Sequence, residues 1–411
     1  MKRFLHTAAL LLAAVTLFAA CAATGTKAPG GTTGSGESTP AGTTAEPGIE
    51  TTAAETTEET FATETAEPTE TPVAPEDADD RAFLDSIEGL TYRLGARGEA
   101  YYFGRWFEKE IDGVNHHVTV TDGSQIFLLT EGCESVDFDF TVITKRKTPY
   151  FAVSIDGEKP KRQLITEKTV ALPDAGRHLL RVVVDSMEEA EAKWREEAGV
   201  ALREIRVPEG GQIRAIMPKN KVVFFYGDSI TEGIMVLAAS NQPKNNSSVA
   251  AYPWTTCERL NAVPYYVGYS GSGVQVVGSF AVFSEAVNHY SRDRKADLET
   301  VKPDVIVINH GTNDGNSSDA GFRGSLKTAI GKIAAAYPGV PIVYMLPFCG
   351  NRASDIRTVC AEFENVTVVE TDRWKITYSD GLHPNRTGAK RAGEALAKEI
   401  EKLLGKDFFK V

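Results

Sequence analysis

The sequence predicts an α/β domain with a parallel sheet, preceded by a β-sandwich and a long non-globular segment. Three observations lead to this prediction. Fully apolar runs alternate with helix-like stretches after residue 221, and short runs separated by Gly or Asp-Gly fill residues 82–212. Residues 22–80 consist mainly of Thr, Glu, Ala, Pro, Gly and Ser. The chain has 411 residues, which is more than one ordinary domain needs.

Residues 1–21 have the pattern of a bacterial lipoprotein signal. Lys2 and Arg3 precede an apolar run over residues 8–20, and this run is shorter than the roughly 20 residues that span a bilayer. Residues 17–21 (LFAAC) resemble a lipobox, although Phe18 stands where an aliphatic residue is usual. We therefore expect an extracytoplasmic lipoprotein anchored to the membrane through Cys21. The alternative is ordinary cleavage near Ala20, with Cys21 uninvolved.

Residues 22–80 form a predicted disordered linker. Their composition buries too little apolar surface to offset the entropy of ordering. They contain thirteen acidic residues and one lysine, while the whole chain carries a net charge of −12. The acidity thus belongs to the linker and says little about the substrate. No basic block is present, so we expect no nucleic-acid partner.

Residues 82–212 read as a β-sandwich or jelly roll that accompanies the following domain. Their short strand-like runs are typical of such folds. The runs cover 114–121, 125–129, 136–143, 150–155, 169–172, 179–184 and 202–207. Residues 187–197 are charged and helix-prone, so we expect them to form an excursion on the surface.

Residues 220–408 form the predicted catalytic domain, with the boundary in 210–220. Fully apolar runs indicate strands covered on both faces, and helical stretches alternate with them. The strands are expected at 222–226, 305–308, 342–346 and 366–369, and the helices at 251–260, 322–336, 353–363 and 386–404.

Three motifs lie where predicted parallel strands or their following loops end, which is where such sheets place ligands. Ser229 follows a Gly-Asp pair, Asn313 follows a Gly-Thr pair, and Asp380 lies three residues before His383. Each motif alone is more often structural, as a helix cap, a turn or a helix start. Together they offer a nucleophile, an amide donor for an oxyanion, and an imidazole oriented by a carboxylate.

In this order the motifs resemble the SGNH (GDSL-type) hydrolases, over residues 221–405. GDS at 227–229, GTND at 311–314 and DGLHP at 380–384 match blocks one, three and five. Block two is matched by GYSGSG at 268–273, where Gly271 follows a serine as in the family and Gly273 is the alternative. The Asn that the family often has upstream of the block-two glycine is absent. The resemblance implies an SGNH-type parallel sheet with helices on both faces.

The same resemblance implies the roles of the site residues. Ser229 would attack an ester carbonyl, His383 would accept and return the proton, and Asp380 would orient His383. The backbone N–H groups of Ser229 and Gly271 and the side-chain amide of Asn313 would form the oxyanion hole. No metal or other cofactor is implied.

The β region adds a second resemblance. YFGRW at 102–106 and a strand over 150–157 that ends in Ile-Asp-Gly, ahead of an SGNH domain, are similar to family 2 carbohydrate esterases. This implies a secreted serine esterase that removes O-acetyl groups from polysaccharide or oligosaccharide. Two alternatives stay open, a lipid or acyl-thioester hydrolase and a carbohydrate-binding surface protein with vestigial catalysis.

Several further residues are candidates for substrate contact or pairing. His310 precedes the block-three glycine, and Trp254 and Trp374 could stack on sugar rings, although Trp is more often found in a core. Residues 234–250 form a polar insertion after the nucleophile that could border the pocket. Cys349 and Cys360 could pair or remain free thiols, and no CxxC pair suggests zinc.

Overall fold

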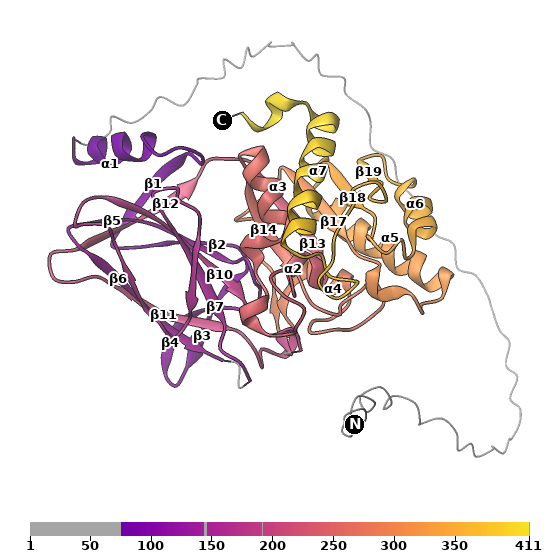
Figure 1. Cartoon of the computed structure of the whole chain (residues 1–411), viewed down its shortest axis with the longest axis horizontal. Coiled ribbons are helices and arrows are strands. Elements are labelled where there is room, and N and C mark those ends of the chain that lie inside the picture. The colour runs from indigo at the N-terminus through magenta and orange to yellow at the C-terminus, as the bar shows by residue number, and fades with distance from the viewer. Residues whose placement is uncertain (1–74, 144–145, 191, 411) are drawn as a thin grey trace, which may run out of the picture. The chain divides into compact units, whose positions relative to one another are not determined.

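The computed structural model of the chain describes residues 75–410 apart from 144–145 and 191 (Figure 1). The predicted signal, Cys21 and most of the predicted linker lie outside these residues. Within the described part, no helix is both long enough and apolar enough to cross a membrane.

Two antiparallel sheets form the β region. The first has seven strands in the order β1-β12-β5-β10-β7-β8, with β2 also paired to β5, and the second has five in the order β3-β4-β11-β6-β9. The first sheet contains β1 (Tyr92–Arg97), β2 (Tyr101–Phe103), β5 (Gln125–Glu131), β7 (Tyr150–Ile155), β8 (Lys161–Leu164), β10 (His178–Ser186) and β12 (Gln212–Pro218). The second contains β3 (Trp106–Ile111), β4 (Val114–Thr119), β6 (Ser135–Val142), β9 (Thr169–Ala171) and β11 (Val200–Arg206).

Alternate side chains of the two antiparallel sheets meet in a shared core. Leu128 and Val182 of the first sheet pack in one cluster with Phe138, Phe140 and Leu202 of the second. This is the packing of a sandwich, in which inward-facing residues alternate with outward-facing ones. The predicted β-sandwich is confirmed.

A five-stranded parallel sheet forms the second region, in the order β14-β13-β17-β18-β19. Its strands are β13 (Val222–Gly227), β14 (Val263–Gly268), β17 (Val305–Asn309), β18 (Ile342–Met345) and β19 (Val366–Val369). The α-helices of this region are α2 (Ser229–Glu232), α3 (Tyr252–Leu260), α4 (Phe283–Asn288), α5 (Asp319–Ala336), α6 (Ala353–Cys360) and α7 (Arg386–Leu404). Short elements complete it: η2 (Pro243–Asn245), η3 (Ser248–Ala250), β15 (His289–Ser291), β16 (Arg294–Lys295), η4 (Thr312–Asp314) and η5 (Lys406–Phe409).

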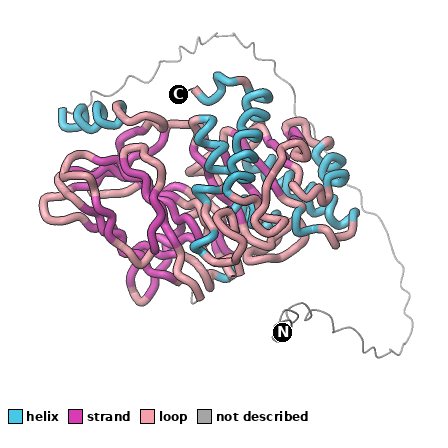
Figure 2. The backbone as a smooth tube through the Cα atoms, in the orientation of Figure 1, coloured by secondary structure: helices cyan, strands magenta, loops and turns pink. Residues whose placement is uncertain are grey.

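Helices cover both faces of the parallel sheet, as predicted (Figure 2). Along β13, Phe224 and Tyr226 belong to the cluster that contains α4, α5 and α6 residues. Val223 and Phe225 belong to the cluster that contains α3 and α7 residues. A strand buried on both faces needs apolar side chains at consecutive positions, which explains the unbroken apolar runs.

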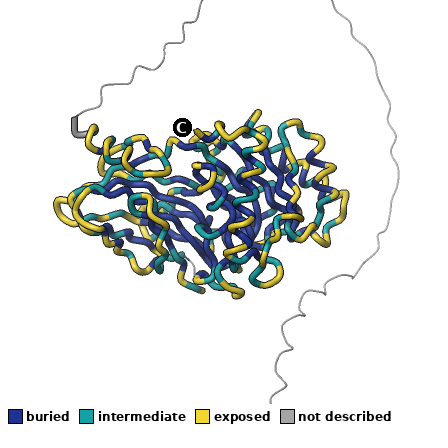
Figure 3. Tube along the Cα trace, turned by 45° about the horizontal axis from the view of Figure 1, so that its top comes forward, coloured by how far each residue is buried: buried dark blue, intermediate teal, exposed yellow. Residues whose placement is uncertain are grey.

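The β region and the α/β region share one core. Phe103 and Phe127 of the first sheet belong to the same cluster as Tyr265 of β14, and the Phe103 and Tyr265 ring centroids are 5.7 Å apart. Gln125 Nε2 donates to the Pro264 carbonyl at 2.8 Å. Buried backbone runs through both regions (Figure 3). The β region is therefore packed against the α/β region along an apolar contact.

The structure corrects three details of the prediction. Residues 75–80, assigned to the linker, begin helix α1 (Pro75–Asp85), and the Asp80 side chain there is buried and paired with Arg214 at 2.9 Å. The region assigned to the boundary contains β12, which pairs with β1 and β5. Residues 187–197 are not a surface excursion, because Met187 and Lys193 are fully buried. The turn η1 (Lys193–Arg195) lies within this segment.

Candidate active site

The nucleophile turn joins β13 to α2. Asp228 caps the helix, because its Oδ1 accepts a hydrogen bond from the Ile230 amide at 3.0 Å. Ser229 is the first helical residue and is 4 % exposed. A Cβ on Gly227 would lie 1.9 Å from the Thr231 Oγ1 atom, so only glycine fits at this tight strand-to-helix turn.

The three predicted triad residues lie in one hydrogen-bonded line. His383 Nε2 is 2.9 Å from Ser229 Oγ, and His383 Nδ1 is 2.8 Å from Asp380 Oδ2. Residues 380–383 bring acid and imidazole together locally, and they lie just before Asn385, which caps α7. The geometry is that of a nucleophile whose base is oriented by a third group.

The Asp380 carboxylate is held by its own loop. Its Oδ1 accepts the backbone N–H groups of His383 at 2.8 Å and Leu382 at 3.0 Å. Partial burial works to raise the pKa of Asp380, but these hydrogen bonds and the imidazole outweigh it and hold the pKa at about 2. Asp380 is therefore a carboxylate throughout the range in which a histidine titrates.

Two of the three predicted oxyanion residues, Gly271 and Asn313, lie in the segments that follow β14 and β17. Gly271 has a φ of +69°, which favours glycine. The Gly273 amide donates to the Val276 carbonyl at 2.8 Å, so it is used within its own loop and Gly271 is the better candidate. Asn313 Nδ2 donates to the Ser272 carbonyl at 2.9 Å, which fixes the amide group and leaves its second N–H available.

Asp314 ties the two oxyanion loops together, a role that the sequence reasoning missed. Its carboxylate accepts the amides of Val274 at 2.9 Å and Gln275 at 2.8 Å, and it is fully buried. The GTND motif thus supplies both a candidate oxyanion donor and the acceptor that positions the neighbouring glycine loop.

The predicted substrate contact at His310 is a buried group. The side chain is 2 % exposed, and its ring centroid lies 4.4 Å from that of Phe283. Burial lowers the pKa of His310 to about 3, so the imidazole is neutral near pH 7. Its Nδ1 atom has no hydrogen-bond partner among the described residues. This environment is that of a packed core side chain, which argues against direct substrate contact.

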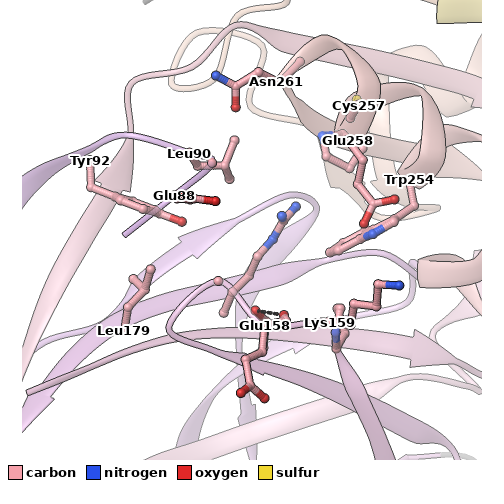
Figure 4. Close-up of a pocket in the computed structure, with 17 residues that line it drawn as sticks. Glu88, Leu90, Tyr92, Glu158, Lys159, Leu179, Trp254, Cys257, Glu258 and Asn261 are labelled. Atoms are coloured by element: carbon pink, nitrogen blue, oxygen red, sulfur yellow. Dashed lines mark hydrogen bonds between the residues drawn. The ribbon is translucent and has the colours of Figure 1, made fainter. Parts of the chain in front are cut away.

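The two tryptophans are not brought to the triad. Trp254 is 4 % exposed, and the Arg181 guanidinium lies 4.1 Å from its ring centroid. It lines a pocket with Tyr92 and Glu158 of the β region, and no triad residue lines that pocket (Figure 4). Trp374 is partly buried and packs near Phe348 at the edge of a core cluster.

The insertion over residues 234–250 is bound to both regions. Ser379 Oγ, next to Asp380, donates to the Met235 carbonyl at 2.7 Å. The Met235 amide donates to Asn246 Oδ1 at 2.9 Å, and Asn246 Nδ2 donates to the Met187 carbonyl at 3.0 Å. The insertion therefore connects the histidine loop, residues 379–385, with the β-region segment that follows β10.

Glu189, the cysteines and potential metal ligands are the remaining side chains with possible chemistry. Glu189 is half-buried, and burial and Glu232 raise its pKa while His383 lowers it. Cys133, Cys257, Cys349 and Cys360 are all free thiols. Among the described residues, no cluster of three His, Cys, Asp or Glu side chains could hold a metal ion.

The fold and the site together define a class of structure: a parallel α/β domain with a hydrogen-bonded Ser-His-Asp arrangement, preceded by a β-sandwich. Residues 225–391 match the model of the GDSL-like Lipase/Acylhydrolase family, and this part of the chain is a GDSL-like lipase/acylhydrolase domain.

Comparison with individual proteins gives a relative that matches about half of this chain. The cellulase/esterase CelE of Acetivibrio thermocellus is 26% identical over 227 residues, which are 48% of this chain and 27% of that protein. The match thus spans about a quarter of that relative.

Solved structures match a larger share of the chain. A family two carbohydrate esterase from Clostridium thermocellum, in complex with cellohexaose, is 22% identical, with a TM-score of 0.63 over 75% of this chain and all of that one. The acetyl xylan esterase Est2A from Butyrivibrio proteoclasticus is 15% identical, with a TM-score of 0.60 over 77% of this chain and all of that one. At these identities the likeness shows the fold.

Proposed function

We propose that the protein is a serine esterase that removes O-acetyl groups from polysaccharide through a covalent acyl-enzyme. The observation that carries the proposal is the line of hydrogen bonds from Ser229 through His383 to Asp380, at 2.9 and 2.8 Å. The GDSL-like domain match and the carbohydrate-esterase fold support it.

In the proposed acylation step, Ser229 Oγ attacks the ester carbonyl and its proton passes to His383 Nε2. Asp380 accepts a hydrogen bond from the Nδ1–H group of His383, which keeps Nε2 of that ring free to act as the base. The carboxylate also stabilises the imidazolium that forms. The tetrahedral intermediate then collapses, the C–O bond to the sugar breaks, and His383 returns the proton to the leaving hydroxyl. Water, activated by His383, releases acetate from Ser229 in the second half of the cycle.

The oxyanion of each intermediate would be held by Ser229 N–H, Gly271 N–H and Asn313 Nδ2. Such donors stabilise charge that exists only in the transition state and intermediate, and removing one typically lowers kcat about 10²–10³-fold. Asn313 is oriented for this by its hydrogen bond to Ser272, before substrate arrives.

A carbohydrate ester is favoured over a lipid ester by the surroundings of the triad. Residues 240–248 of the insertion are polar apart from Pro243. The Met235 carbonyl is engaged with Ser379, and the Asn246 side chain is engaged with the β region. A site for long acyl chains needs a large apolar groove, whereas acetyl transfer needs only a small acyl pocket beside a polar sugar-binding surface.

Acetate release from acetylated polysaccharides tests this function. Wild-type protein should release acetate from at least one acetylated glycan and hydrolyse an aryl acetate, and Ser229→Ala should lower both rates by several orders of magnitude while remaining folded. Ser86→Ala, an exposed serine between α1 and β1, is the control. Preference for long-chain acyl esters would favour a lipase. Glycan binding without hydrolysis would favour a vestigial site.

We further propose that the protein is exported and anchored through Cys21. The proposal is supported by the signal-like residues 1–21 and the linker-like composition of the residues that follow. Cys21→Ala should move the protein from the membrane fraction to the soluble fraction in cell fractionation. A variant that still sediments with membranes would overturn the anchor.

A further inference from the structure

A lysine of the β region is buried beneath the nucleophile helix. Lys193 lies in η1, and its side chain has no solvent exposure. Its Nζ atom contacts Glu232 Oε1 and lies 3.4 Å from Asp122 Oδ2, and both carboxylates are also buried. A charged side chain is rarely fully buried unless it is paired, so the burial of Lys193 depends on these two carboxylates.

Glu232 connects this lysine to the oxyanion loop. Glu232 is the last residue of α2, one turn after Ser229. While Oε1 faces Lys193, Oε2 accepts a hydrogen bond from Ser270 Oγ at 2.6 Å. Ser270 directly precedes Gly271, the candidate oxyanion donor, so the ion pair holds the chain at the residue before that donor.

The charges of the cluster support a fixed Lys193–Glu232 pair. Burial works to lower the pKa of Lys193, but Asp122 and Glu232 outweigh it and raise the pKa, so the ammonium group stays charged. Burial raises the pKa of Asp122 well above its usual value, and the nearby Glu232 raises it further. The positive charge of Lys193 works in the opposite direction and lowers the pKa of Asp122.

The same β-region turn holds the oxyanion loop from a second side. The Trp194 amide donates to the Ser279 carbonyl at 3.0 Å, and the Ser279 amide donates to the Ser270 carbonyl at 2.8 Å. The Trp194 ring also packs edge-on against Phe280, with centroids 4.6 Å apart. Ser270 is thus held through its side chain by Lys193 and Glu232, and through its carbonyl by Trp194 and Ser279.

We propose that Lys193 is a positioning residue for the oxyanion hole, acting through Glu232 and Ser270 on the Gly271 amide. The inference rests on the proposed esterase function and assigns part of the catalytic machinery to the β region. An oxyanion donor works only when its N–H points at the developing charge, and displacements of about 1 Å at an active site can cost about 10²-fold in rate. Lys193 contacts no reacting atom, so its effect passes entirely through the loop.

The test is a double-mutant cycle measured on an aryl acetate. The variants are Lys193→Met, Ser270→Ala and the double variant, each checked for a cooperative melt. If Lys193 acts through Ser270, each single change lowers kcat by roughly tenfold with KM changed less than about twofold, and the double variant is no slower than the slower single variant. If the two losses multiply, or if Lys193→Met changes only KM, the proposal is overturned.

A second pair of variants covers the case in which Lys193→Met does not fold, because it leaves buried carboxylates without their cation. Glu232→Gln and Glu232→Gln/Ser270→Ala examine the same connection from the other end. The proposal requires the double variant to match Glu232→Gln in kcat, and a multiplicative loss overturns it.

The chain offers a matched control in a second Ser–Glu–Lys arrangement between the two regions. Ser291 Oγ donates to Glu196 Oε1 at 2.5 Å, and Lys109 Nζ lies 2.6 Å from Glu196 Oε2. Ser291→Ala and Lys109→Met should leave kcat within about twofold of wild type. A wild-type protein with no esterase activity would refute the proposed function itself, whereas multiplicative losses in an active enzyme would refute only the role of Lys193.

Discussion

Replacement of Asp380 offers a sharp prediction because its two oxygens have different partners. Oδ1 accepts two backbone amides, from His383 and Leu382, while Oδ2 faces His383 Nδ1. In Asp380→Asn, the side-chain oxygen should occupy the Oδ1 position, since an NH₂ group there would face two N–H donors. The NH₂ group must then face His383 Nδ1 and force that nitrogen to accept.

The consequence for catalysis is the wrong tautomer. With Nδ1 accepting, His383 carries its proton on Nε2 and cannot take the proton of Ser229. In serine-protease triads the equivalent change lowers kcat about 10⁴-fold, or roughly 5 kcal/mol, and we expect a loss of that order here. Asp380→Ala imposes no tautomer, so its loss should be smaller than that of Asp380→Asn.

The measurement is the steady-state rate of hydrolysis of an aryl acetate by the two variants. Asp372→Asn, an exposed aspartate on the same segment, is the control. The order wild type, then Ala, then Asn supports the reasoning. An Asn variant that is as active as the Ala variant would show that the loop does not dictate the amide orientation. Activities of both within about tenfold of wild type would show that Asp380 does not orient His383.

Three further predictions concern the oxyanion loop and two buried titratable groups. Asn313→Ala should lower kcat about 10²-fold or more with little change in KM, and a rise in KM at constant kcat would instead indicate ground-state binding. Burial raises the pKa of Asp228 to about 6, so the free energy of unfolding of the wild type should fall as pH rises from about 4 to about 6. Asp228→Asn still caps α2, and above pH 6 urea unfolding should show it to be more stable than wild type by about 2–3 kcal/mol. A difference in stability between the two proteins that does not change with pH would refute this. Burial lowers the pKa of His310 to about 3, so the free energy of unfolding should fall as pH drops below about 6.5. At pH near 5 this loss amounts to about 2 kcal/mol, and His310→Gln should remove it. Equal acid sensitivity of the variant and the wild type would show that His310 does not cause it.

Much of the fold could be predicted because its signals are local. Strands β13, β17 and β18 are buried on both faces, and their residues are apolar apart from Gly227 and Asn309 at the ends of β13 and β17. The Asp380–His383 pair could be predicted because both residues lie in one loop. Strand β14 was not predicted, since Pro264 and two tyrosines obscure its apolar pattern, although all its residues are buried.

The parts that could not be predicted depend on contacts between distant segments. Lys193 and Glu232 are charged, and charged residues by default belong on the surface, so nothing local marks them as a buried pair. The choice of Gly271 over Gly273 required the hydrogen bond that uses the Gly273 amide. Trp254 was a candidate sugar platform by residue type, but Arg181 covers its ring, a fact that no spacing along the chain contains.

The central claim is that Ser229 is a nucleophile activated by His383. The most direct measurement is peptide mapping by mass spectrometry after reaction with a fluorophosphonate ester, which forms a stable adduct with an activated serine. The account predicts one adduct, on the peptide that contains Ser229, with labelling lost in Ser229→Ala and greatly slowed in His383→Ala. An adduct on a different serine, or labelling at the wild-type rate without His383, would contradict it.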